Sequence, residues 1–92
     1  MSLETFRGRW PKNIRGRFYV DRWCLDCDLC RETAPWSFTR DDEAGNSFVY
    51  RQPTTPDEVK GCLEAVEGCP QGNVHDDGSS FDWDAVPPDP LQ

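Results

Sequence analysis

The heptapeptide CLDCDLC, Cys24 to Cys30, places three cysteines at a strict three-residue spacing. A lone C-x-x-C pair is weak evidence of a function, because zinc sites and redox dithiols share it. Three thiolates from one short loop are more informative, since a structural zinc site usually takes two ligands from each of two loops. The spacing suits an iron–sulfur cube, in which one loop holds three corners and a distant cysteine holds the fourth.

The fourth ligand is predicted from a second copy of the same pattern. The bacterial iron–sulfur motif runs C-x₂-C-x₂-C-x₃-C-P, and its last cysteine serves the other cluster of a two-cluster protein. In residues 24–35 that last cysteine is replaced by Ala34. Residues 59–70 keep the last cysteine before Pro70 but hold only Cys62 of the three earlier ones. The chain therefore looks like a two-cluster repeat reduced to one cluster, with the ligands Cys24, Cys27, Cys30 and Cys69.

Both stretches resemble the two signatures of the single-cluster bacterial-type [4Fe–4S] ferredoxins. The matching segments are VDRWCLDCDLCRETAP and CLEAVEGCPQGNV, and the resemblance covers about residues 17–76. It implies an α+β, ferredoxin-like βαββαβ sandwich, here with N- and C-terminal extensions. It also implies one [4Fe–4S] cluster, which oxidation can convert to [3Fe–4S]. The implied function is an electron carrier, with no enzyme activity of its own, that shuttles single electrons between a reductase and an acceptor enzyme.

The fifth cysteine, Cys62, is expected to be a buried remnant of the lost repeat rather than a ligand. It falls on the apolar stripe of a predicted helix, where a free cysteine behaves as a small hydrophobic residue. Some relatives hold a disulfide near this place, but the partner slot here is Ala34, so no disulfide within the chain is expected. Other interpretations stay open: a structural zinc-binding module, a redox dithiol, and a sensor or electron-bifurcating role for the cluster.

The rest of the core sequence predicts an alternation of short strands and helices. The best-marked element is a helix over residues 56–67, because Thr55 and Glu58 form a capping box. Gly68 is expected to end this helix. The other predicted elements are strands at residues 17–20 and 73–75, a helical turn before Pro35, and a β-hairpin that turns through Asp41–Glu43. This order indicates helices packed on an antiparallel sheet.

Length and composition place the 92 residues in one domain, divided into a basic arm (1–16), a cluster-binding core (17–76) and an acidic, Pro-rich tail (77–92). No apolar run approaches the 18 or so residues of a membrane span, and no apolar leader begins the chain. A cytoplasmic protein without membrane contact is therefore expected, and in that compartment clustered cysteines usually bind metal.

Charge is distributed unevenly along the chain. Residues 1–23 carry six Arg and Lys against two acids, a net charge of +4, whereas residues 24–92 carry a net charge of −11. The overall charge of −7 argues against nucleic acid as a partner. The acidic part favours redox-partner proteins with basic docking surfaces, and the carrier is expected to be a monomer.

The two extensions carry aromatic residues that need a burial site. The arm is expected to dock on the acidic body through Phe6 and Trp10, with a partner-gripping arm as the alternative. The tail is expected to be anchored on the body by Phe81 and Trp83. The single histidine, His75, lies among acidic residues and is expected to face solvent.

Overall fold

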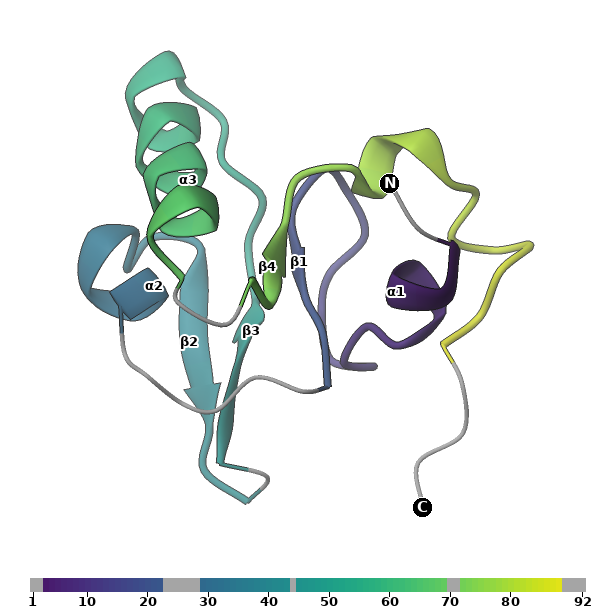
Figure 1. The fold of residues 1–92 in the computed structure, drawn as a ribbon. Coiled ribbons are helices and arrows are strands. Elements are labelled where there is room, and N and C mark those ends of the chain that lie inside the picture. The colour runs from purple at the N-terminus through teal and green to yellow at the C-terminus, as the bar shows by residue number, and fades with distance from the viewer. Residues whose placement is uncertain (1–2, 23–28, 44, 70–71, 89–92) are drawn as a thin grey trace.

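Short strands and helices alternate along the chain in the computed structural model, which describes residues 3–22, 29–43, 45–69 and 72–88. Between residues 19 and 75 the order is strand, helix, strand, strand, helix and strand (Figure 1), which is the order that the sequence predicts. None of the helices in the described ranges is long and apolar enough to cross a membrane. In chain order the elements are α1 (Leu3–Arg7), β1 (Tyr19–Val20), α2 (Leu29–Thr33), β2 (Phe38–Asp41), β3 (Asn46–Val49), α3 (Pro56–Gly68), β4 (Val74–His75) and the 3₁₀ helix η1 (Gly78–Ser80).

The strands pair antiparallel, and the described strands form two small sheets. β1 pairs with β4, with Tyr19 opposite His75. β2 pairs with β3, with Phe38 opposite Val49, and the chain turns between them at Gly45, which has a φ of 76°. The predicted hairpin is therefore confirmed. Membership of the ferredoxin-like fold class stays a prediction, because the four strands are not joined into one sheet by direct pairing in the described residues.

Two side-chain amides connect the sheets instead. Asn13 Oδ1 accepts hydrogen bonds from the backbone nitrogens of Val20 in β1 (3.1 Å) and of Val49 in β3 (2.9 Å). Asn13 Nδ2 also donates to Val20 O (2.8 Å). Gln52 accepts from Phe18 N (3.1 Å) and donates to Phe18 O (2.8 Å). These amides therefore satisfy backbone groups that a continuous sheet would pair.

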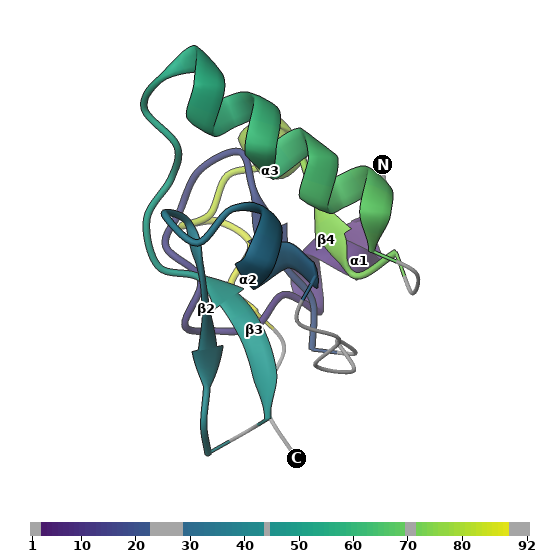
Figure 2. The ribbon, with the colours of Figure 1, turned by 90° about the vertical axis from the view of Figure 1, so that its left-hand side faces the viewer.

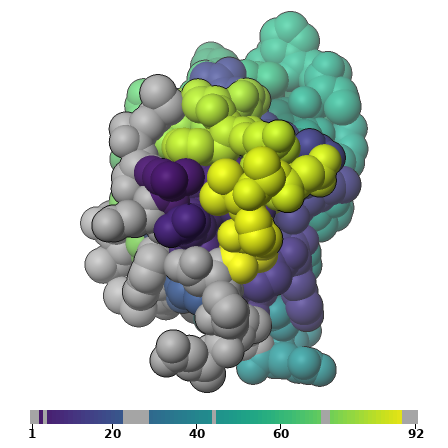
Figure 3. Space-filling model, turned by 90° about the vertical axis from the view of Figure 1, so that its right-hand side faces the viewer, coloured from purple at the N-terminus to yellow at the C-terminus, as the bar shows by residue number. Residues whose placement is uncertain are grey.

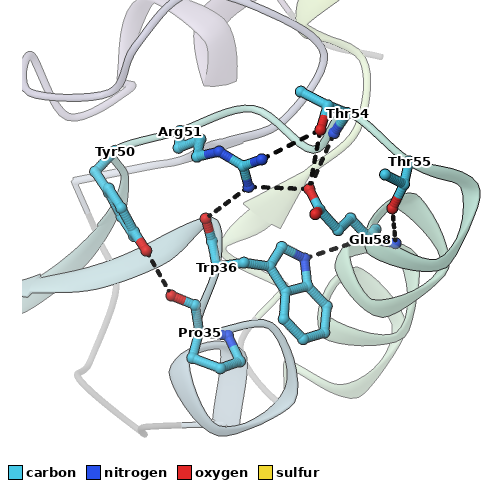
Figure 4. A network of polar contacts seen from close by, with 7 residues as sticks. All are labelled: Pro35, Trp36, Tyr50, Arg51, Thr54, Thr55 and Glu58. Carbon is cyan, nitrogen blue, oxygen red and sulfur yellow. Dashed lines mark hydrogen bonds and ion pairs between the residues drawn. The ribbon is translucent and has the colours of Figure 1, made fainter.

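Helix α3 begins as predicted, at Pro56 after an N-cap at Thr55. Thr55 Oγ1 accepts from Glu58 N (3.2 Å), but the Glu58 carboxylate accepts from Thr54 N (3.1 Å), one residue before the position that a capping box requires. Arg51 Nη1 pairs with the same Glu58 oxygen at 2.9 Å (Figure 4). The backbone hydrogen bond from Thr54 is the main reason why the pKa of Glu58 lies below its usual value, and Arg51 adds to this effect.

Helices α2 and α3 pack antiparallel, and two glycines of α3 allow the close contact. At one end, a Cβ on Gly61 would overlap the Trp36 ring and would lie 3.5 Å from Thr33 O at the end of α2. At the other end, a Cβ on Gly68 would lie 2.9 Å from Leu29 Cδ2 at the start of α2. Gly68 ends α3 as predicted, but within the described residues it is not among the positive-φ glycines. Its missing side chain therefore serves helix packing rather than a left-handed cap.

The main core lies between the strands and the layer formed by α2 and α3 (Figures 1 and 2). Val20 of β1 points into this core, whereas its neighbour Tyr19 points to the opposite side, as the alternation of a strand requires. Trp36 packs, partly buried, against this core. The buried members are Phe18, Val20, Cys30, Ala34, Phe38, Val49, Cys62, Ala65 and Val74.

A second, aromatic cluster lies on the other side of β1 and is built by the arm and the tail. Phe6 is fully buried, stacks on Phe81 with ring centroids 4.4 Å apart, and meets Trp83 edge-on at 5.3 Å. Tyr19 is also fully buried and meets Phe6 edge-on at 5.5 Å. Figure 3 shows α1 and the tail side by side on this face. Docking of the arm through Phe6 is thus confirmed, and the tail residues Phe81 and Trp83 pack on the arm.

Positive charges in and next to the arm are paired with acidic side chains of the hairpin, of the residue after β4 and of the tail. The pairs are Lys12–Asp41 (3.1 Å), Arg15–Asp84 (3.2 Å) and Arg17–Asp76 (3.8 Å). Asp41 is only 5% exposed and also accepts a hydrogen bond from Trp10 Nε1 (3.0 Å). Asp41 is therefore more than the simple turn residue that the sequence predicts, because at the end of β2 it binds Lys12 and Trp10 of the arm.

His75 does not face solvent, and that prediction is wrong. Its side chain is 21% exposed, and its Nε2 lies 2.8 Å from Asp21 Oδ2. The ring also stacks on Tyr19, with centroids 4.9 Å apart. The reason is the register of the β1–β4 pair, which sets His75 directly opposite Tyr19.

The contact of Gly61 with Trp36 gives a direct test of the helix packing. We expect Gly61→Ala to lower the free energy of unfolding by about 1–2 kcal/mol, because overpacking costs about 1–3 kcal/mol and exceeds the helix propensity that alanine adds. Lys60→Ala, at the exposed neighbouring position, should change stability by less than about 0.5 kcal/mol. Denaturant unfolding followed by circular dichroism measures both, and a stabilised Gly61→Ala protein would contradict the packing.

Candidate metal centre

Two of the four predicted ligands lie in described residues, and the packing of α2 on α3 brings their segments together. Cys30 is the second residue of α2 and is 3% exposed. Cys69 directly follows α3 and packs, partly buried, against the main core to which Cys30 belongs. The residues just before them touch, since a Cβ on Gly68 would lie 2.9 Å from Leu29 Cδ2. Two cysteines far apart in sequence thus lie at the same end of the helix pair.

The backbone changes direction directly after Cys69. Cys69 N still donates to Ala65 O (3.1 Å), so this residue caps α3, but its own φ of −66° and ψ of 114° are those of extended backbone. Gly72 N then donates back to Cys69 O (3.1 Å), and Gly72 has a φ of 66°. A positive φ of this size favours glycine. Cys69 is therefore held between the end of α3 and the turn that leads to β4.

The other two predicted ligands, Cys24 and Cys27, lie outside the described residues, as does Pro70. Within residues 3–22, 29–43, 45–69 and 72–88, no group of three or more His, Cys, Asp or Glu side chains could hold a metal ion. A complete ligand set therefore requires residues 23–28, which we call the cysteine segment. The chain leaves β1 through Asp21 and Arg22 to enter this segment and continues into α2 at Leu29.

The donor atoms present fit an iron–sulfur cluster. Cys30 and Cys69 provide thiols at one end of the α2–α3 pair, next to the apolar main core. Thiolates are the ligands of such clusters, and apolar burial of the sulfur atoms limits their contact with water. The two thiols would hold two corners of a cluster, and the cysteine segment supplies thiols of the right kind and spacing for the others.

Cys62 occupies a different place from Cys30 and Cys69. It is fully buried in the main core, and burial is the largest cause that raises the pKa of its thiol, against an opposing effect of Ser37 and Trp36. Ser37 and Trp36 follow α2, whereas Cys30 lies at its start. Seven residues of helix separate Cys62 from Cys69, a rise of about 10 Å. This position is consistent with a non-ligand thiol.

Asp21 ties the chain before the cysteine segment to the chain after Cys69. Asp21 N donates to Asn73 O (3.0 Å), and its carboxylate bonds His75 Nε2 (2.8 Å). Asp21 is 3% exposed. Sequence reasoning missed this residue, because an aspartate next to a cysteine motif has no local signal that it pairs with a histidine on a distant strand.

Exposed carboxylates flank both described cysteines. Glu32 lies two residues after Cys30, and Glu67 lies two residues before Cys69; both are exposed. Glu64 is exposed one helical turn before Glu67. Each of the two described cysteines therefore has an exposed carboxylate two residues away in the sequence.

Comparison with known proteins agrees with this site. The family described as the 4Fe-4S single cluster domain of Ferredoxin I matches residues 20–76. Ferredoxin-1 of Desulfocurvibacter africanus is 34% identical over 61 residues, which cover 64% of this chain and 89% of that protein. The family match runs from β1 to just beyond β4 and includes all four predicted cysteine ligands, but it leaves out the whole arm and the whole tail. The chain belongs to the family of single-cluster [4Fe–4S] ferredoxin domains.

Proposed function

We propose that the protein is a one-electron carrier whose single [4Fe–4S] cluster is held by Cys24, Cys27, Cys30 and Cys69. The observation that supports this best is the contact of Leu29 with Gly68, which brings Cys30 and Cys69 to one end of the helix pair. When bound, the cluster supplies a reversible one-electron couple. The protein's own part is to hold the thiolates, to keep water from them on the side of the main core, and to present the cluster to a partner.

The proposal requires no substrate pocket, general base or nucleophile, because electron transfer follows docking. We propose that the carrier works as a cytoplasmic monomer between a reductase and an acceptor enzyme. Four cysteine ligands favour the complete cube, and oxidation would remove one iron to leave [3Fe–4S]. A zinc-binding module would use the same thiolates, so cluster content must be measured directly.

The protein purified or reconstituted without oxygen should contain about four irons and four sulfides per chain. It should be brown, and reduction by one electron should bleach its visible absorbance. Iron, acid-labile sulfide and zinc are measured on the same sample. Stoichiometric zinc without sulfide would support the zinc-binding module and would rule out the carrier.

Paired cysteine variants test the ligand set. Cys62→Ala should keep the full cluster content and the visible spectrum, and should lower stability by about 1 kcal/mol because a small buried side chain is shortened. Cys69→Ala should fail to hold a complete cube, because it removes a ligand and not a core residue. Iron content and absorbance of the two variants, reconstituted in parallel, decide the assignment; loss of iron from Cys62→Ala would overturn it.

We further propose that the exposed carboxylates around the thiols steer a partner with a basic docking surface. Charged residues at the rim of such a contact change the association rate more than the affinity. The acidic residues of the hairpin and tail are less suited to this role, because Asp41, Asp76 and Asp84 already pair with cations of the chain.

Charge-neutral variants can separate these two surfaces. Glu32→Gln with Glu67→Gln should slow reduction of cytochrome c, a strongly basic one-electron acceptor, by about 3- to 10-fold at low salt. Asp84→Asn, which removes a carboxylate of the tail, is the matched control and should have little effect. At an ionic strength where the Debye length is about 3 Å, all three rates should converge. Equal slowing by Asp84→Asn in stopped-flow measurements would show that the steering is not local to the thiols.

A further inference from the structure

The N-terminal arm runs alongside the residues that lead into the cysteine segment. Trp10 N donates to Val20 O (3.0 Å), and Arg9 and Asp21 form an antiparallel β-bridge. Arg22 N donates to Gly8 O (2.8 Å). The arm therefore pairs with residues 20–22, that is, with the last residue of β1 and the two described residues that follow it before the cysteine segment.

The side chain of Arg22 strengthens the same contact. Its Nε donates to Gly8 O (3.2 Å), so this carbonyl accepts from both the backbone and the side chain of Arg22. On its other side, Asp21 bonds Asn73 and His75, which belong to the chain after Cys69. Asp21 and Arg22, the last described residues before the cysteine segment, are thus fixed between the arm and β4.

The arm is in turn held by the tail. Phe6 is fully buried between Phe81 and Trp83, and the Arg9 guanidinium lies over the rings of Phe6 (4.0 Å) and Trp83 (4.5 Å). Arg9 also donates to Phe6 O (3.0 Å) and to Val86 O (2.7 Å). Arg9 is 3% exposed, so these bonds are protected from water. The four side chains Phe6, Arg9, Phe81 and Trp83 form what we call the arm–tail clasp.

We propose that the arm–tail clasp is a positioning element for the cluster: it fixes Asp21 and Arg22, and through them the cysteine segment. This inference rests on the proposed function. When the residues before and after a segment are held in place, here by the clasp and by α2, the segment samples fewer conformations, and less conformational entropy is lost when its cysteines bind the cluster. Residues that orient ligands control both metal retention and the environment of the sulfur atoms, which sets the reduction potential. The clasp lies outside the residues that the family match covers.

Full-length variants that loosen the clasp from two different segments provide the test. Phe6→Ala acts from the arm and Trp83→Ala acts from the tail, and neither residue is a proposed ligand. In the reconstituted holoprotein, each should increase the rate of cluster loss to a chelator by about 10-fold, the lower end of the effect of residues that orient metal ligands. The double variant should be little faster than either single one, because both changes open the same clasp. Each should also shift the reduction potential in the same direction.

The control is Thr55→Ala, which removes the N-cap of α3 at the end remote from Cys69 and lowers stability without touching the clasp. Its reduction potential should match that of the unmodified protein. Phe6→Leu, a milder change, should give an intermediate rate and keeps the test valid if Phe6→Ala does not fold. Clasp variants that lose the cluster no faster than Thr55→Ala, or that leave the potential unchanged, would overturn the proposal. Iron and sulfide in the unmodified protein are measured first, so failure of the carrier function is seen separately.

Discussion

The structure depends on one constraint: thiols from two segments far apart in sequence must meet at one end of a small apolar core. The close packing of α2 on α3 meets it, because Gly68 has no side chain to separate α3 from Leu29. Gly61 does the same at the other end, where the Trp36 ring occupies the space of a Cβ. Antiparallel helices in contact at both ends fix the relative positions of Cys30 and Cys69 more firmly than either short strand pair could. The helix pair, rather than the sheet, is therefore the scaffold of the centre.

The elements whose signals are local could be predicted from the sequence. Thr55 and Pro56 mark the start of α3, and a polar turn with Gly45 marks the hairpin. The predicted ligand pattern is also local, since spacing alone predicts three of the cysteines and the Cys-Pro pair predicts the fourth. The structure places Cys30 and Cys69 together, while Cys24 and Cys27 lie outside the residues that it describes. For the site, the sequence therefore supplies the donor atoms, and the structure supplies the reason why two of them meet.

Tertiary contacts made by polar side chains could not be predicted in this way. Asn13 joins β1 to β3 through three hydrogen bonds, yet an asparagine in a basic arm reads as an ordinary turn residue. The Asp21–His75 pair likewise depends on the register of two strands of two residues each, and no periodicity is visible over so short a length. The capping box fails by one residue for a related reason: Arg51 and Thr54 both bond the Glu58 carboxylate and draw it away from Thr55 N. In each case a side chain takes a partner that its sequence neighbours do not indicate.

The arm and tail also change how the charge of the chain acts. By composition alone the basic arm opposes an acidic body, but in the structure Lys12 and Arg15 of the arm pair individually with Asp41 and Asp84. An exposed pair such as Arg15–Asp84 stabilises by about 0–1 kcal/mol, so the fully buried ring of Phe6 contributes more to holding the arm in place. This pairing bears on where a redox partner would dock. The exposed carboxylates next to Cys30 and Cys69 in the sequence, Glu32 and Glu67, belong to the helix pair and not to the clasp, so the proposed docking surface lies on the elements that hold the two thiols.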